Sequence, residues 1–293
     1  MGRSLNILGC GRVGRALGSL FVRHSIFSRV TVCNRTPESS RRAAAFVPQA
    51  KAVDSIAEMP PCDAWMIASA DSAVQEAAQL LVAQQSLVEG NLVFHVSGAQ
   101  SSEVLEPLRA RGARLGSLHP VRSIASPELV VTSFTGTACA IEGDESARAE
   151  LRTMVEAIGG KPFEVDSRAK MICHAGHVFA SNYLVTVVDV ARRLYEEAGI
   201  PVEVAETMLP PIVRGTVENV CALGTTEALT GPVVRGDASL VERQLSALSE
   251  VNPEIASLYR ELVRHATVIA ERRGHLPEEA VEALRRIQAR QGA

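Results

Sequence analysis

The sequence lacks a strong net charge of either sign. Its 30 lysines and arginines stand against 33 aspartates and glutamates, which gives a formal net charge of −3. The basic residues are scattered along the chain rather than gathered in a run. Nucleic acids and anionic membrane surfaces select for clustered basic charge. We therefore expect neither of them as a partner.

Disulfide patterns and metal-binding cysteine motifs are also missing. None of the six cysteines forms a C-x-x-C pair, and no short cluster with histidine has the spacing of a metal site. Unpaired cysteines of this kind are typical of proteins in a reducing compartment. The sequence thus predicts buried, reduced thiols, no metal site and a cytoplasmic protein.

Long hydrophobic runs are absent as well. No uninterrupted apolar stretch approaches the roughly 18 residues of a membrane span, and the first residues lead at once into a predicted strand, so we expect no signal peptide. The 293 residues are enough for about two domains.

A glycine-rich turn stands between a predicted strand and a predicted helix near the start of the chain. Residues 4–8 (SLNIL) form an apolar strand pattern, and GCGRVG follows it. In such a G-x-G-x-x-G motif the first glycine permits the turn, the second lets a pyrophosphate approach the backbone, and the third lets helix and strand pack closely. The helix N-terminus adds free N–H groups for a phosphate. The predicted dinucleotide-binding residues of this segment are Gly9, Gly11, Arg12, Val13 and Gly14.

The end of the second predicted strand, residues 30–33, indicates which dinucleotide is bound. An NAD enzyme usually carries an acid there for the ribose 2′-hydroxyl. This chain has Asn34, Arg35 and Thr36 instead, and an arginine fork suits a 2′-phosphate. The sequence predicts NADP as cofactor; the alternative is a solvated arginine with no ligand.

Strand and helix patterns continue to alternate up to residue 165. Such alternation predicts a doubly wound, mostly parallel α/β sheet, in which ligands bind beyond the carboxyl ends of the strands. Ser69, Ser97 and His119 lie at such ends, so we expect Ser69 at the cofactor and the other two near the substrate. The further predicted strands are 64–69, 92–98, 114–120, 137–143 and 162–165, with helices over 72–87, 102–111 and 146–158.

The pattern changes to helix alone after Val165. We predict a Rossmann domain over residues 1–166 and an all-helical substrate and dimerisation domain over 167–293. Its first helix, about 168–197, is apolar round most of its circumference, which favours burial in a twofold homodimer. Further helices are predicted at 203–208, 212–222, 239–248, 253–273 and 277–290.

A polar stripe interrupts the apolar surface at the start of that long helix, in KMICHAGHVFASN (170–182). Lys170, His174, His177 and Ser181 fall within about 60° of one another on a helix, with Asn182 beside them. We expect Lys170 to reach solvent near the helix start and to supply a proton for reduction of a carbonyl or imine. His174 and Asn182 are predicted to orient the substrate. The alternative for His177 and Ser181 is a structural role, and the alternative for Lys170 is an ordinary solvated surface residue.

The loop ALTGPVVRGD (228–237) is the last candidate. Arg235 either presents its charge to an anionic group of the substrate or belongs to an ordinary turn in which Asp237 caps the next helix.

The motifs GCGRVG, HVSG, LHP, KMICHAGHVFASN and LTGPVVRGD together resemble the superfamily of 6-phosphogluconate-dehydrogenase-like and β-hydroxyacid dehydrogenases over nearly the whole chain. Within it, they resemble an uncharacterised branch of Rossmann-like NADP oxidoreductases whose helical C-terminal domain has no known function. The resemblance implies NADP binding and dimerisation. It matches Lys170 to the catalytic lysine of the hydroxyacid dehydrogenases and Ser97–Gly98 to their Ser-Gly segment, whereas His174 replaces their asparagine.

The sequence therefore predicts an NADP-dependent oxidoreductase for a small, anionic carbonyl, hydroxyacid or imine compound. The rival hypothesis is a sensor or scaffold that binds NADP without turnover. A transferase that uses another nucleotide is the third.

Overall fold

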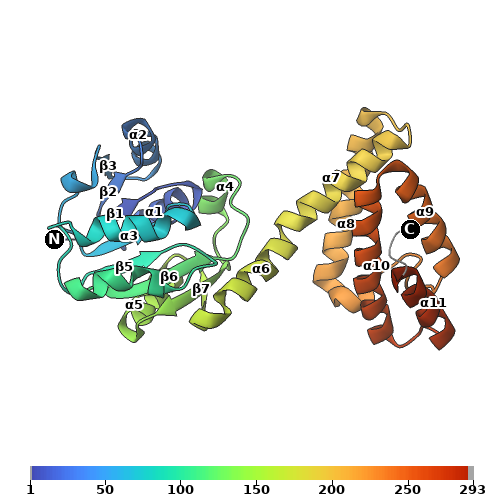
Figure 1. Cartoon of the computed structure of the whole chain (residues 1–293). Helices are drawn as coiled ribbons and strands as arrows, with labels where there is room; N and C mark the ends of the chain where they lie inside the picture. Colours follow the sequence, from blue (N-terminus) through green and yellow to red (C-terminus); the bar gives the residue numbers. More distant parts are fainter. Residues whose placement is uncertain (1, 290–293) are drawn as a thin grey trace. The chain divides into compact units, whose positions relative to one another are not determined.

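The computed structural model describes residues 2–289, which divide into two compact units. The first extends to Asn182 and the second begins at Tyr183. The first unit is a sheet with helices, and the described part of the second is helical (Figure 1).

One sheet of eight strands organises the first unit, in the order β3-β2-β1-β4-β5-β6-β7-β8. All neighbouring strands are parallel except β6 and β7. The strand order reverses between β1 and β4, and the carboxyl ends of strands at such a point form a crevice. The strands are β1 (Ser4–Leu8), β2 (Arg29–Cys33), β3 (Ala50–Ala52), β4 (Ala64–Ile67), β5 (Leu92–His95), β6 (Arg114–Pro120), β7 (Ala138–Gly143) and β8 (Lys161–Glu164).

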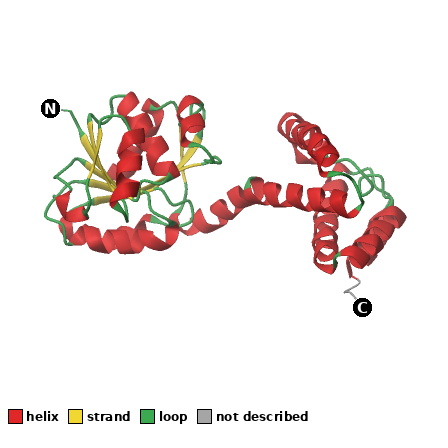
Figure 2. Ribbon diagram, turned by 90° about the horizontal axis from the view of Figure 1, so that it is seen from above, coloured by secondary structure: helices red, strands yellow, loops and turns green. Residues whose placement is uncertain are grey.

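Helices cover both faces of this sheet (Figure 2). The α-helices are α1 (Arg12–Arg23), α2 (Pro37–Phe46), α3 (Val74–Val82), α4 (Pro127–Thr132) and α5 (Glu145–Ala157). Short 3-10 segments are η1 (Ile56–Glu58), η2 (Asp71–Ala73), η3 (Ser102–Arg111) and η4 (Ser167–Ala169). The predicted helix over 102–111 is thus a 3-10 segment, and Pro107 within it removes one donor from the α-helical pattern.

The core of the first unit lies on the two faces of the sheet. On β4, Ala64 and Met66 belong to one apolar cluster and Trp65 and Ile67 to the other. Side chains of a strand alternate between faces, so a strand buried on both is apolar throughout. The predicted mostly parallel, doubly wound fold is confirmed.

The long predicted helix over 168–197 is interrupted. Helix α6 (Lys170–Ala180) and helix α7 (Asn182–Glu197) meet at Ser181, whose φ of −126° and ψ of −67° are not helical. Ser181 donates its hydroxyl to the carbonyl of His177, a back-bond that bends helices. Residues 167–182, which we predicted to begin the helical domain, count with the sheet in the compact first unit.

The segment Ser167–Glu197 is long and apolar enough, by length and composition alone, to cross a bilayer. Polar residues are spaced along it, so no single uninterrupted apolar run within it reaches the length of a membrane span. Its first half carries Lys170, which is buried against Ser117 of β6 and Glu142 of β7. That contact assigns the start of α6 to the fold of the sheet unit.

The second unit continues with helices only in its described part. They are α8 (Val202–Ala228), α9 (Ala238–Val251), α10 (Pro253–Arg273) and α11 (Glu278–Ala289). Two predicted helices, 203–208 and 212–222, are joined in α8 across Pro210 and Pro211, and the backbone turns at Gly224 with φ 77°. Residue 290, the predicted end of the last helix, lies outside the described residues.

Candidate nucleotide and histidine site

The glycine turn has the geometry that its sequence predicts. Gly9 has φ 73°, and its N–H donates to the carbonyl of Cys33 at 2.9 Å. A Cβ on Gly9 would lie 2.7 Å from the backbone of Ser69, so no side chain fits. A Cβ on Gly11 would meet no atom closer than 3.9 Å. Gly9 is therefore required by the fold, whereas the space at Gly11 remains open to a ligand.

A cleft of about 990 Å³ lies beyond the carboxyl ends of β1, β2 and β4. Gly9, Gly11, Arg35 and Ser69 are among the residues that line it. The Ser69 hydroxyl is buried and has no hydrogen-bond partner among the described residues. An orphaned buried hydroxyl is costly unless a ligand or water completes it. Volume, glycine backbone and hydroxyl donor all fit a dinucleotide.

Asn34 has a structural part in this cleft that the sequence did not reveal. Its side-chain oxygen accepts from the N–H of Cys10 at 2.6 Å, and its amide donates to the carbonyl of Ser39 at 2.9 Å. One side chain thus ties the glycine turn to the start of α2. The residue lines the cleft, but these side-chain groups already hold the loops in place.

Arg35 and Thr36 both line the cleft but have different structural roles. Thr36 is the N-cap of α2 and accepts from the N–H of Ser39. Arg35 is exposed and has no hydrogen bond or ion pair among residues 2–289. Of the two later arginines, Arg41 lies 3.6 Å from Asp54, and Arg42 lies 3.9 Å from Glu38. The guanidinium of Arg35, at the end of β2, is therefore available for a ligand.

A second pocket of about 440 Å³ adjoins the cleft, because both are lined by Ala68, Ser69 and Ala70. Its remaining lining residues are Arg12, Val13, Asp71, Val96, Ser97, Gly98, His119 and His174. Two predicted substrate residues from β6 and α6, His119 and His174, are thereby brought into one pocket. All of its walls belong to the first compact unit.

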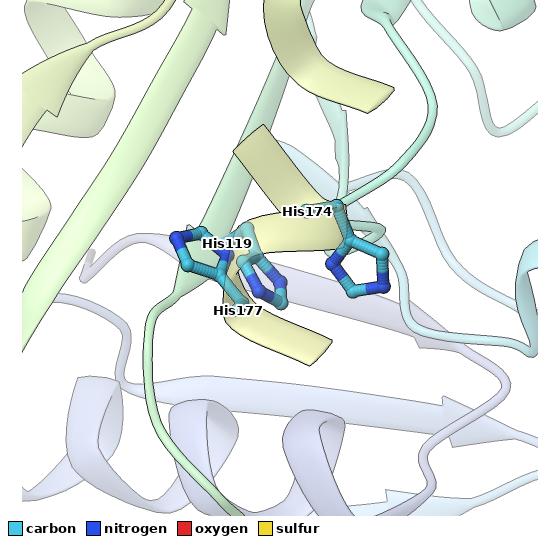
Figure 3. A group of neighbouring side chains, drawn as sticks. All are labelled: His119, His174 and His177. Atoms are coloured by element: carbon cyan, nitrogen blue, oxygen red, sulfur yellow. The ribbon is translucent and has the colours of Figure 1, made fainter. Parts of the chain in front are cut away.

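Three imidazoles meet beside this pocket (Figure 3). The ring of His119 lies 5.6 Å from that of His174 and 5.8 Å from that of His177, measured between centroids. His119 donates from Nδ1 to the carbonyl of Val96 at 3.2 Å, which directs its Nε2 lone pair into the cluster. Burial lowers the pKa of His119 to about 4 and also lowers that of His177. His119 is therefore neutral at pH 7.

Lys170 is not at the surface, and the prediction that its head reaches solvent is wrong. The side chain is 1% exposed. Its ammonium donates to Ser117 Oγ at 2.6 Å and to the carbonyl of Ser97 at 3.3 Å. The carboxylate of Glu142 lies 3.9 Å away. Burial lowers the pKa of Lys170 to about 8, and Glu142 opposes this effect.

Glu142 is the partner that the sequence analysis missed. It accepts from the backbone N–H of Ser102 at 2.8 Å and from the hydroxyls of Ser102 at 2.7 Å and Ser117 at 3.0 Å. These donors make a buried carboxylate tolerable. The available signal was the acid within the apolar strand TACAIEG, which we interpreted only as part of a strand.

His95 and Ser97 are structural neighbours of the pocket. His95 donates from Nε2 to the carbonyl of Ser101 and accepts from the N–H of Ser97, so both ring nitrogens are engaged. Burial lowers its pKa to about 4. The Ser97 hydroxyl accepts from the N–H groups of Ala99 and Gln100. Its acceptor positions thus stabilise the turn after β5.

Two other predicted site residues lie elsewhere. Asn182 is exposed at the start of α7, has its side-chain oxygen 2.8 Å from the Ser181 hydroxyl and is absent from the walls of the second pocket. Arg235 is exposed in the second unit, in a loop that is anchored by buried Val233. Asp237 caps α9 through the N–H of Leu240, as the alternative interpretation of that loop predicted.

The cysteines match their prediction except at two positions. All six thiols are free, and four of them are buried. Cys173 is half-buried and Cys221 is exposed.

Comparison with protein families divides the chain in two. Residues 2–120 match the model of a Rossmann-like domain. That part of the chain is a Rossmann-like domain. Residues 137–266 match the model of a domain of unknown function, DUF2520. A search of curated protein sequences found no match.

Solved structures share this arrangement. Protein TM1727 from Thermotoga maritima superposes with a TM-score of 0.72 at 23% identity, over 92% of this chain and 100% of that one. A putative NADP oxidoreductase, BF3122 from Bacteroides fragilis, gives 0.72 at 24% identity, over 91% and 98%. An imine reductase from Myxococcus stipitatus in complex with NADP⁺ gives 0.61 at 18% identity, over 92% and 99%. At these identities the likeness establishes the fold.

Proposed function

We propose that the protein is an NADP-dependent oxidoreductase that acts on a small carbonyl, hydroxyacid or imine compound. The observation that carries this proposal is the continuity of the glycine-lined cleft with the histidine-lined pocket through Ala68, Ser69 and Ala70. A dinucleotide held in the cleft would place its reactive end beside a pocket that suits a small molecule.

The cofactor would be held by the first unit alone. The helix α1 N-terminus and the open space at Gly11 would accept the pyrophosphate, and the orphaned Ser69 hydroxyl would find its partner there. Arg35 would fork onto a 2′-phosphate. The similarity to an NADP oxidoreductase and to an imine reductase that was solved with NADP⁺ supports this choice.

The bound nicotinamide supplies or accepts a hydride. The chain's own contribution is to position a substrate beside it and to exclude water. His119 and His174 line the pocket, and Arg12 and Asp71 bring one charge of each sign to its wall.

Lys170 corresponds by resemblance to the catalytic lysine of the hydroxyacid dehydrogenases, but its ammonium does not line the pocket. We assign it a positioning role: it binds the carbonyl of Ser97 and thereby fixes the segment that leads to Gly98. The membership in the 6-phosphogluconate-dehydrogenase-like superfamily, the homodimer and the cytoplasmic location stay part of this proposal.

The first test is calorimetric titration of NADPH into the wild type and Gly11→Ala. The added methyl group meets open space, so the fold should be unchanged while it occupies room that the pyrophosphate needs. We expect a loss of at least about tenfold in affinity, or 1.4 kcal/mol. Gly215→Ala, also in open space but in α8, is the matched control and should bind as wild type. Equal affinity of all three would refute the assigned cleft.

The second test separates the enzyme from the NADP-binding sensor. NADPH oxidation is followed by absorbance while carbonyl and imine compounds are screened, and NADP⁺ reduction is followed in the same way for hydroxyacid compounds. Turnover that is lost in His174→Ala supports the oxidoreductase. Tight NADPH binding with no turnover across all three classes favours the sensor.

A further inference from the structure

The cluster of His119, His174 and His177 has a second property besides its place at the pocket. Each ring offers one nitrogen, and these three nitrogens lie within 4.8 Å of one another. His174 and His177 are three residues apart on α6, so they share one face of the helix. His119 reaches the same point from the end of β6 (Figure 3). The spacing along the chain hides this group, which is why the sequence predicted no metal site.

The free nitrogens of the cluster have no other use among residues 2–289. Nδ1 of His174 and Nδ1 of His177 are both buried and lack a hydrogen-bond partner. Nε2 of His177 lies 3.7 Å from the sulfur of Cys173, and the tautomer in which Nε2 donates to that sulfur leaves the lone pair on the buried Nδ1. His119 donates its Nδ1 proton to the carbonyl of Val96, the arrangement by which metal-binding histidines are usually oriented. Two buried nitrogens without a partner and one oriented lone pair therefore belong to the same cluster.

Gly98 keeps the space beside these nitrogens open. A Cβ at this position would lie 2.5 Å from Nδ1 of His174 and 2.8 Å from Nε2 of His119. The two nitrogens thus converge on the backbone at Gly98, and a larger residue would occupy the gap.

We propose that His119, His174 and His177 bind one divalent transition-metal ion, with Zn²⁺ as the best match. Imidazole ligands suit Zn²⁺, Cu²⁺ and Ni²⁺, and three protein ligands with an open fourth position are typical of catalytic zinc. Bonds of about 2.0–2.1 Å place tetrahedral nitrogens about 3.3 Å apart. The three rings therefore have to close by at most about 1.5 Å, which side-chain rotation provides.

The fourth position of this ion faces the second pocket, because His119 and His174 line that pocket. It accepts a water molecule or a lone pair of a substrate, such as a carbonyl oxygen. An ion there would polarise that group and stabilise the negative charge that develops on its oxygen. Metal binding requires no nucleotide, so the inference stands independently of the proposed function.

The experiment is a Zn²⁺ titration of tag-free, chelator-treated protein without nucleotide. We expect one ion per chain and a loss of at least a hundredfold in affinity for each of His119→Ala, His174→Ala and His177→Ala. His265→Ala is the control, since this residue lies on α10 of the second unit. Cys173→Ser and Cys221→Ser test the two thiols that are not buried. Affinity that survives the histidine changes, or that is lost only with the thiols, would overturn the proposal.

X-ray absorption of the Zn²⁺-loaded wild type guards against variants that fail to fold. We expect a first shell that contains three imidazole nitrogens at about 2.0–2.1 Å from Zn²⁺ and no sulfur at 2.3 Å. A sulfur-dominated shell, or no stoichiometric binding, would refute it. NADPH titration of the same samples is a separate readout: NADPH binding without Zn²⁺ binding removes the metal site alone, and the reverse result removes the proposed cofactor.

Discussion

Lys170→Met tests the buried network in which Lys170 contacts Ser117 and Glu142. Methionine keeps most of the side-chain volume but removes the charge. Glu142 then loses its counter-charge while it stays buried. Breaking a buried ion pair by removing one partner typically costs about 3–5 kcal/mol.

The expected cost lies near the lower end of that range. Glu142 retains three hydrogen bonds from Ser102 and Ser117, and the variant no longer has to bury an ammonium. We therefore expect a loss of about 3 kcal/mol. For a unit of this size, that loss lowers the melting temperature by about 6–12 °C.

Urea unfolding followed by tryptophan fluorescence measures this loss of stability in the compact unit that contains Lys170. Trp65 is the single tryptophan of the chain and is buried in β4 of the sheet unit. The double variant Lys170→Met/Glu142→Gln closes a double-mutant cycle and should recover at least 1 kcal/mol relative to additive losses. Wild-type stability of Lys170→Met, or strictly additive losses, would refute the coupled pair.

Three further predictions follow from the same structure. Because folding lowers the pKa of Lys170 to about 8 from 10.5, the unfolded state binds more protons between these values. The free energy of unfolding of the wild type, relative to that of Lys170→Met, should therefore increase from pH 8 to pH 10. Urea unfolding at both pH values measures it, and an unchanged or smaller difference at pH 10 would contradict the buried lysine. Arg35→Ala should weaken NADPH binding by about tenfold to a hundredfold and leave NADH binding unchanged, with Arg41→Ala, whose side chain is near Asp54, as control; equal NADPH and NADH affinities in the wild type would contradict the assigned 2′-phosphate contact. The side chains of Ile172 and Val185 are 74% and 70% exposed, and such apolar surface favours burial against a second copy of the chain. Sedimentation velocity should therefore give twice the 31.3 kDa of one chain. A monomer throughout a dilution series would exclude the dimer.

The sheet could be predicted because its signals are local. Apolar strands, the glycine turn and helical periodicity each depend on a few neighbouring residues. The short strand Ala50–Ala52 escaped because three residues carry no pattern. The break at Ser181 escaped because a serine back-bond depends on the local backbone rather than on a breaker such as proline.

The site was predictable only in its parts. The spacing of His174 and His177 predicts a shared helix face. Nothing in the sequence indicates that His119, more than fifty positions earlier, completes their cluster. The burial of Lys170 depends likewise on Ser117 and Glu142, which belong to two strands whose pairing the sequence does not specify. A titratable residue near a helix start was therefore assigned to the surface, and tertiary packing reversed that assignment.

The most direct test of the account is a crystal structure of the protein with NADP⁺ bound. We predict the pyrophosphate at Gly11, the 2′-phosphate at Arg35, and the nicotinamide ring in the pocket lined by Ser97, Gly98 and His174. A ring directed out of this pocket, or a 2′-phosphate remote from Arg35, would contradict it.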